Sequence, residues 1–170
     1  MPILTDDMKR VVREQSLGFF ATVCPNGTPN LSPKGTTSIL DDDHIVFADL
    51  FSPGTIRNLR WNPAVELNVI DPITRTGYRF KGRGEVHADG PVFEDVMAFF
   101  DKERQLARSR VRHVVVITVE FAEPLVSPAY DLGLTAEEVA DRSWRRLEQI
   151  YGVRIDRTGD PDADEPFTPQ

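Results

Sequence analysis

A hairpin signal close to the start of the chain constrains the fold more than any other feature of the sequence. An apolar run over residues 19–24 is followed by the turn P-N-G-T-P and by a second extended segment at 30–39. Asn26 and Gly27 form one of the strongest short hairpin signals, because both residues tolerate a positive φ angle. The first two strands are therefore expected to pair with each other as an antiparallel hairpin.

The second strand of this hairpin has an unusual centre, N-L-S-P-K-G. Pro33 cannot donate a hydrogen bond to a neighbouring strand, and Gly35 has no side chain to pack. Such a strand is expected at the edge of a sheet, or at a place where a ligand lies against the backbone. In the first case Pro33 and Lys34 protect an open edge against aggregation. In the second they present backbone groups and an ammonium to the ligand.

A strand at 44–50 and a short helix at 53–61 follow. Ser52 is placed to cap that helix, Pro53 occupies its first position, and Asn62-Pro63 ends it. The start of the helix offers free backbone N–H groups, hydroxyls and a guanidinium, which is what a phosphate group needs. The residues concerned are Ser52, Gly54, Thr55 and Arg57. The alternative interpretation is an ordinary capped helix with an arginine on its surface.

Hydrophobic periodicity and capping signals place the remaining elements. They predict strands at 64–70, 77–88 and 111–121, and helices at 5–16, 91–104 and 135–151. Six strands with few helices between them indicate a mainly β fold, a six-stranded antiparallel barrel with peripheral helices. We expect residues 1–152 to form one domain and the acidic, proline-rich segment 153–170 to be disordered. Trp61, next to a helix end, is expected in the core.

Composition and charge exclude several classes of function. The chain of 170 residues has a formal net charge of −7, so a nucleic-acid partner is not expected. Its one cysteine, Cys24, excludes an internal disulfide and fits a reducing compartment. There is no signal-peptide pattern and no apolar run approaching the roughly 20 residues of a membrane helix, so we expect a cytoplasmic protein without a membrane partner. His44, His87 and His113 are isolated in the sequence, and no metal site is predicted.

Several segments between residues 17 and 130 together resemble the flavin-binding split-barrel family, which includes pyridoxamine 5'-phosphate oxidase and the small FMN-binding proteins. The resemblance rests on N-L-S-P-K-G at 30–35, T-I-R-N-L-R-W-N-P-A-V-E-L at 55–67, G-Y-R-F-K-G-R-G-E-V at 77–86 and D-G-P-V-F-E-D-V at 89–96. It implies an FMN-binding split barrel that forms a homodimer, with two equivalent cofactor sites at the boundary between the subunits.

The resemblance also implies roles for particular residues. The equivalent of segment 52–58 holds the ribityl phosphate in the family, and the equivalent of 32–36 runs along the edge of the isoalloxazine ring. Many relatives have a Lys or Arg where Gly54 and Thr55 stand here, so Arg57 is expected to matter more for the phosphate. Two interpretations stay open for the cations of a later strand, Arg79, Lys81 and Arg83: they supply the missing charge, locally or across a dimer, or they form a solvated face balanced by Glu85. The candidate cofactor-binding residues are Ser32, Pro33, Lys34, Gly35, Thr36, Ser52, Gly54, Thr55, Arg57, Asn58 and Lys81.

The expected function is that of an FMN-dependent oxidoreductase acting on an unidentified small molecule. The flavin would carry out the hydride or electron transfer, which fits the absence of a recognisable acid–base pair in the sequence. Three alternatives stay open. They are a reductase that uses the deazaflavin cofactor, a non-catalytic FMN-binding protein for electron transfer or flavin storage, and a barrel that has lost cofactor binding. The sequence identifies neither the substrate nor the electron donor, and no residue is assigned a catalytic role.

Overall fold

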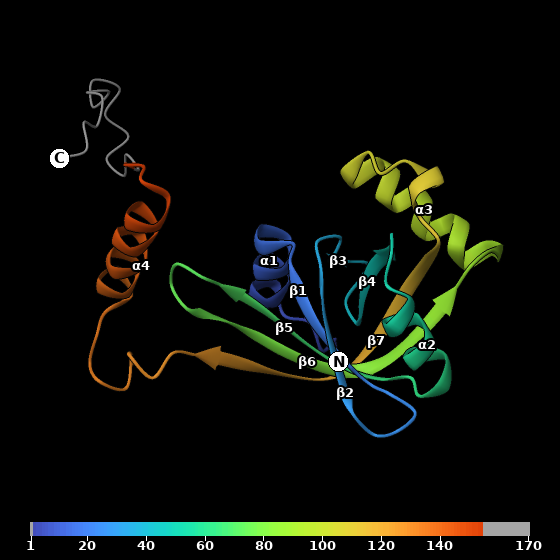
Figure 1. The fold of residues 1–170 in the computed structure, drawn as a ribbon, viewed down its shortest axis with the longest axis horizontal. Helices are drawn as coiled ribbons and strands as arrows, with labels where there is room; N and C mark the ends of the chain where they lie inside the picture. Colours follow the sequence, from blue (N-terminus) through green and yellow to red (C-terminus); the bar gives the residue numbers. More distant parts are fainter. Residues whose placement is uncertain (1, 155–170) are drawn as a thin grey trace. The chain divides into compact units, whose positions relative to one another are not determined.

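Seven strands form one sheet in the computed structural model, which describes residues 2–154. Their order in the sheet is β2-β1-β5-β6-β7-β4-β3, and the sheet curls as the expected antiparallel split barrel does (Figure 1). The strands are β1 (Gly18–Val23), β2 (Pro29–Lys34), β3 (Ser38–Ile39), β4 (His44–Asp49), β5 (Ala64–Asp71), β6 (Thr76–His87) and β7 (His113–Val126). The two edge strands, β2 and β3, are consecutive in the chain, which confirms the edge position expected for the N-L-S-P-K-G strand.

The strand count differs from the expected six because the segment predicted as one strand at 30–39 is divided in two. Thr36 lies in the turn between β2 and β3. Its hydroxyl donates to the Ala48 carbonyl oxygen at 2.9 Å and accepts from the Ala48 N–H at 3.0 Å. A side chain therefore takes the place of a backbone partner opposite Ala48, and the strand is interrupted there.

The four helices begin and end within one residue of their predicted bounds. They are α1 (Asp6–Gln15), α2 (Pro53–Trp61), α3 (Gly90–Arg104) and α4 (Ala136–Tyr151), and a short 3₁₀ helix, η1 (Arg108–Arg110), follows α3. Local capping explains this agreement. Thr5 accepts a hydrogen bond from the Met8 N–H at the start of α1, and Thr135 and Glu138 form a reciprocal capping box at the start of α4.

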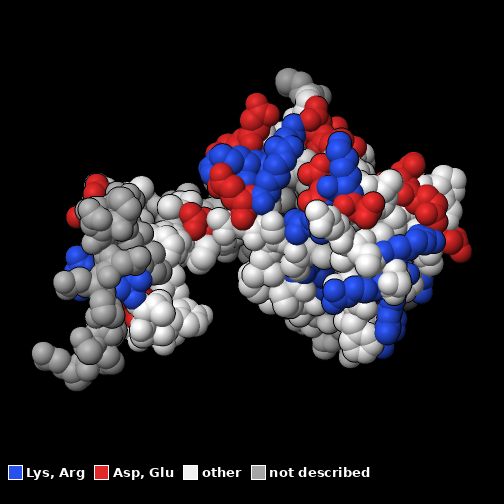
Figure 2. Space-filling view, turned by 90° about the horizontal axis from the view of Figure 1, so that it is seen from above, with Lys and Arg blue, Asp and Glu red and all other residues white. Residues whose placement is uncertain are grey.

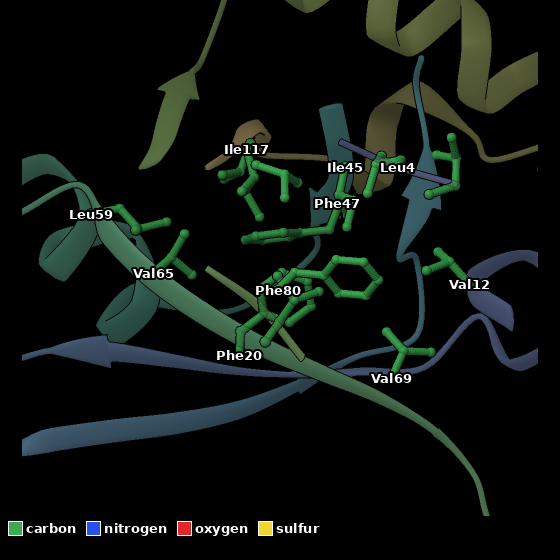
Figure 3. Close-up of a cluster of buried hydrophobic side chains, with 14 of the residues drawn as sticks. Leu4, Val12, Phe20, Ile45, Phe47, Leu59, Val65, Val69, Phe80 and Ile117 are labelled. Carbon is green, nitrogen blue, oxygen red and sulfur yellow. The ribbon is translucent and has the colours of Figure 1, made fainter. Parts of the chain in front are cut away.

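The core lies inside the curl of the sheet. Phe20 of β1, Phe47 of β4 and Phe80 of β6 are fully buried there, among aliphatic side chains from α1, α2 and the other strands (Figure 3). A second apolar cluster joins α3 to the outer side of β4 and β7, through Phe93 and Phe100 among others. Strand β4 is therefore buried on both faces, which explains its continuous apolar run.

The described residues divide into two compact units. The first unit comprises the chain up to Ile70 and the segment Gly77–Leu125, and it contains the curled sheet with α1, α2 and α3. The second unit comprises the turn Asp71–Thr76 and the residues from Val126 on, including α4. Apart from residues 153 and 154, the acidic segment expected to be disordered lies outside the described residues. Each described helix is too short or too polar to cross a membrane.

Candidate functional site

The inner face of the edge strand β2 carries polar side chains, whereas the neighbouring strand β1 places Phe20 in the core. Asn30, Ser32 and Lys34 alternate along β2 and face inward, because every second residue of a strand lies on the same side. Leu31, between them, is 67% exposed on the other side. The hairpin register pairs Ser32 with Phe20, so this polar strip begins at the border of the apolar core.

The start of α2 has backbone N–H groups that no side chain caps. Ser52 occupies the N-cap position, as expected, but its side chain makes no capping hydrogen bond. Its carbonyl accepts the Ile56 N–H at 3.1 Å, which begins the helix. Pro53 has no N–H, and the next two N–H groups belong to Gly54 and Thr55. Together with the positive end of the helix dipole, these groups make the start of α2 attractive to an anion.

A buried polar cluster connects α2 with β1 and β2. The Asn30 amide donates to the hydroxyls of Thr22 at 3.0 Å and of Thr55 at 3.5 Å. The Asn58 amide donates to the same Thr22 hydroxyl at 3.1 Å and lies 3.4 Å from the Cys24 sulfur. Asn58 is completely buried, and its Oδ1 atom has no hydrogen-bond partner among the described residues. A buried amide oxygen without a partner is costly unless a ligand or water supplies a donor.

Lys34 lies at the other end of the strip with its side chain turned inward. The residue is only 4% exposed, and its ammonium donates to the Ser32 hydroxyl. The same nitrogen lies 5.6 Å from the centre of the Phe47 ring, within the range of a cation–π contact. Burial lowers the pKa of Lys34, and the negative charge of Asp49 partly opposes this effect. The strip therefore ends in a positive charge held in a largely apolar surrounding.

Asp49 and His113 form a hydrogen-bonded pair beside this lysine. Asp49, the last residue of β4, is 2% exposed, and its Oδ2 lies 3.0 Å from His113 Nδ1. The two residues are brought together because β4 and β7 pair in a register that sets Asp49 opposite His113. The second carboxylate oxygen of Asp49 has no partner in the described part of the chain. The carboxylate of Asp49 therefore stabilises the positive charge of Lys34, and its contact with His113 keeps that carboxylate in position.

The lowered pKa of Lys34 predicts how stability depends on pH. Between that pKa and the ordinary value of 10.5, the unfolded chain binds more protons than the folded chain. The free energy of unfolding should therefore rise as the pH increases through this interval. We expect Lys34→Met to remove the rise, as measured by urea unfolding at a series of pH values up to 10.5. Lys102→Met, at an exposed lysine of α3, is the control that should keep it. If the free energy of unfolding of Lys34→Met rises with pH as much as that of the unchanged chain, the effect does not come from the buried Lys34 ammonium.

The turn between β2 and β3 is held by structural contacts. The hydroxyl of Thr36 is engaged by Ala48, as described above. Gly35 is exposed, and its carbonyl accepts a hydrogen bond from the guanidinium of Arg104 at 3.1 Å. Arg104, at the end of α3, also donates to the Thr37 carbonyl at 2.8 Å. These contacts fix the end of β2, and with it the position of Lys34.

The remaining candidates lie away from the polar strip. Pro33 is exposed on the outer side of β2, and Arg57 is exposed on α2. Lys81 also lies on the outer side of the sheet, since Phe80 next to it points into the core. There it pairs with Glu66 at 3.2 Å and borders a hollow of about 410 Å³. The structure thus brings Ser32, Lys34, Gly54, Thr55 and Asn58 to the inner face of β2 and the start of α2, and separates Lys81 from them.

Large apolar side chains gather on the outer face of β1, β2 and β5, near this hollow. We call this surface the outer apolar face, and it consists of Leu17, Phe19, Leu31 and Ile70. The register explains why these residues are neighbours, because it sets Phe19 opposite Pro33 and Ala21 opposite Leu31. An exposed apolar surface of this kind usually marks a place of association with another molecule.

Comparison with known proteins shows where this architecture belongs. A family model described as pyridoxamine 5'-phosphate oxidase matches residues 4–124, which is most of the chain. The chain belongs to the pyridoxamine 5'-phosphate oxidase family. This confirms the resemblance inferred from the sequence. The polar strip, the start of α2 and the Asp49–His113 pair all lie within the matched part, whereas α4 lies beyond it.

Solved structures of other proteins share this family fold. HupZ from group A Streptococcus is 28% identical, with a TM-score of 0.64 over 72% of this chain and 94% of its own. An FMN-binding protein from Syntrophomonas wolfei is 16% identical, with a TM-score of 0.59 over 73% of this chain and 87% of its own. A protein described as F420 reductase is 22% identical, with a TM-score of 0.55 over 70% of this chain and 98% of its own. No curated protein matches the chain.

Three polar residues in and beside the polar strip escaped the sequence-based prediction. Asn30 belongs to the N-L-S-P-K-G strand, and the two-residue period of that strand could have placed it beside Ser32. Asp49 and His113 carry no such signal. They are 64 residues apart, and only the pairing of β4 with β7 brings them into contact.

Proposed function

We propose that the chain binds FMN and acts as a flavin-dependent oxidoreductase on a small molecule. One observation supports this most directly. The uncapped start of α2 lies next to the polar inner face of β2, so anion-binding N–H groups and a row of hydrogen-bonding side chains adjoin each other. A phosphate ester attached to a polar chain and a planar ring needs such a sequence of groups. Membership of the family, and the fold shared with an FMN-binding protein, agree with this proposal.

The phosphate of FMN would be held at the start of α2. Gly54 and Arg57 are three residues apart and therefore lie on the same side of this helix. A Cβ atom on Gly54 would stand 3.4 Å from Asn30 Oδ1, in ordinary van der Waals contact, so this part of α2 lies directly against Asn30 of β2. The N–H groups of Gly54 and Thr55, the Thr55 hydroxyl and the Arg57 guanidinium would then bind the phosphate oxygens. Ser52 and the Asn58 amide support this arrangement.

The rest of the cofactor would lie along β2. Ser32 and Lys34 would face the ribityl chain or the ring edge, with Pro33, Gly35 and Thr36 shaping the backbone on that side. Asp49 would attract the Lys34 ammonium, because the two groups carry opposite charges in a buried setting. The bound flavin supplies hydride or electron transfer, while the chain binds it, orients it and keeps water away. Lys81 would contribute charge from the outer side of a neighbouring subunit.

The homodimer belongs to the same proposal. A second copy of the chain would cover the outer apolar face, which otherwise leaves Leu31 and Phe19 in water. The subunit boundary would then pass along β2, next to the proposed cofactor, and the molecule would have two equivalent sites. Light scattering at micromolar concentration should give the mass of a dimer. The mass of a monomer, with and without FMN, would contradict this part of the proposal.

Titration of three cofactors into the purified chain tests the proposed function. We expect FMN to bind, with a change in its visible absorption and fluorescence, and riboflavin to bind more weakly because it lacks the phosphate. Binding of the deazaflavin F420 in place of FMN would favour a deazaflavin-dependent reductase, in line with the fold shared with F420 reductase. Bleaching of bound FMN by NADH or NADPH would distinguish an enzyme from a flavin store. If none of the three cofactors binds, the proposal is wrong.

A further inference from the structure

A pocket of about 440 Å³ lies entirely within the second unit. One wall is the turn at 71–76, and the others come from the chain after residue 126, including α4. The volume falls in the usual range of about 300–1,000 Å³ for small-molecule sites. Apart from that turn, its walls lie beyond residue 124, where the match to the oxidase family ends. The function proposed for the polar strip therefore does not account for this pocket.

Three arginines border the pocket. Arg142 and Arg146 are four residues apart and hence lie on one face of α4, and Arg75 comes from the turn. Figure 2 shows basic side chains on the α4 part of the surface, at the left of the view. Arg145, which does not line the pocket, pairs with Asp141 at 2.9 Å. The salt bridges between described residues do not include the three pocket arginines, and Arg142 interacts electrostatically with Glu138, one turn earlier on α4.

The turn that carries Arg75 is fixed in one conformation. Arg75 has a φ angle of +57°, in the left-handed region that non-glycine residues rarely adopt. The Asp71 carboxylate accepts hydrogen bonds from the Ile73 N–H at 2.8 Å and from the Thr74 hydroxyl at 2.7 Å. The Arg75 carbonyl accepts from the Ser127 N–H at 3.1 Å. The backbone that presents this arginine to the pocket is therefore held from both sides.

The inside of the pocket is apolar. Val139 is 2% exposed, and Leu134 and Leu147 line the pocket with it. Ser143, also in the lining, donates its hydroxyl hydrogen to the Val139 carbonyl at 3.0 Å. The pocket thus combines an apolar interior with guanidinium groups, and it has no carboxylate side chain in its lining.

We propose that this pocket binds an organic anion, a carboxylate or phosphate attached to an apolar body. Guanidinium forks match the oxygens of either anionic group and bind them through paired hydrogen bonds. The leucine and valine side chains would cover the apolar body. This inference does not rest on the proposed FMN site, because no residue of the pocket belongs to the polar strip or to α2.

Calorimetric titration of the full chain with decanoate, decyl phosphate and decanol tests the proposal. At least one of the two anions should bind, and decanol should bind at least about tenfold more weakly, since a charge-assisted hydrogen bond contributes roughly 1.5–3 kcal/mol. Tighter binding of decanoate identifies a carboxylate ligand, and tighter binding of decyl phosphate identifies a phosphate ligand. Equal binding of decanol, or no binding of either anion, would overturn the proposal.

Two variants locate the binding. Arg142→Met should weaken anion binding at least about tenfold, for the same reason, without changing the helix content measured by circular dichroism. Arg145→Met, on the same helix but outside the pocket, should leave anion binding as it is. Equal effects of the two changes would place the anion elsewhere on the surface. FMN should bind to both variants with the affinity of the unchanged chain. The FMN site and the anion pocket are therefore tested independently, and one proposal can fail without the other.

Discussion

Phe20→Ala is expected to lower the free energy of unfolding by about 3–5 kcal/mol, the range for removing a buried aromatic ring from a core. Phe20 has no exposed surface, and its ring meets that of Phe47 edge to face with 4.8 Å between the centres. The backbone of Gly18 adjoins the same ring so closely that a Cβ there would stand 2.6 Å from it. Neighbours packed this tightly on several strands cannot all move into the space, so a cavity would remain. Urea unfolding followed by circular dichroism measures the loss.

Phe51→Ala is the matched control for this change. Phe51 is 72% exposed, and the Arg112 guanidinium lies 4.7 Å from its ring centre. Such an exposed cation–π contact contributes about 0.5–1 kcal/mol, so the control should cost no more than that. Similar losses for the two variants would show that Phe20 is not at the centre of the core.

Arg57→Ala should weaken FMN binding about thirtyfold, which corresponds to about 2 kcal/mol, the contribution expected of one charge-assisted hydrogen bond. The reason is that Gly54 and Thr55 supply no cation at the start of α2, so this guanidinium would carry much of the attraction for the phosphate. Riboflavin has no phosphate, and its affinity should stay within about twofold, because no charged contact is removed from it. Fluorescence titration with both ligands measures the two affinities.

Arg60→Ala provides the comparison on the same helix. Arg60 is exposed, like Arg57, but it lies in the last turn of α2, away from the uncapped N–H groups. Its removal should change FMN binding little, because exposed charges are screened by salt over roughly 8–10 Å. Equal weakening by the two changes would indicate a general effect of net charge. Equal weakening of FMN and riboflavin by Arg57→Ala would place the phosphate elsewhere.

The helices could be predicted closely because their ends depend on local signals. Thr5, Ser52 and Thr135 stand at the N-caps where the sequence places them, and Gly152 ends α4 in the left-handed conformation. The division of the expected strand 30–39 could not be predicted. It depends on the contact between the Thr36 hydroxyl and the backbone of Ala48, and nothing near Thr36 in the sequence indicates that contact.

The expected burial of Trp61 was wrong for a related reason. The side chain is 59% exposed, because the buried face of α2 is formed by Ile56 and Leu59, and Trp61 follows Leu59 by about 200° around the helix. For the candidate site, the sequence indicated the segments 32–36 and 52–58, but not which side chains from different strands contact each other. Whether the eleven residues named at the outset hold a cofactor stays a prediction. The contact of Asp49 with His113 depends on the register in which β4 and β7 pair. That register cannot be read from the sequence of either strand alone.

The division of the second unit between two parts of the chain has a consequence for how such a protein can diversify. The turn at 71–76 lies inside the segment shared with the oxidase family, whereas α4 lies outside it. A relative without a C-terminal addition can keep the hairpin turn and lack the pocket altogether. An addition that folds against this turn would create the proposed anion site while leaving β2 and α2 untouched. The two proposed ligand specificities could therefore be gained, lost and modified by independent changes in one gene.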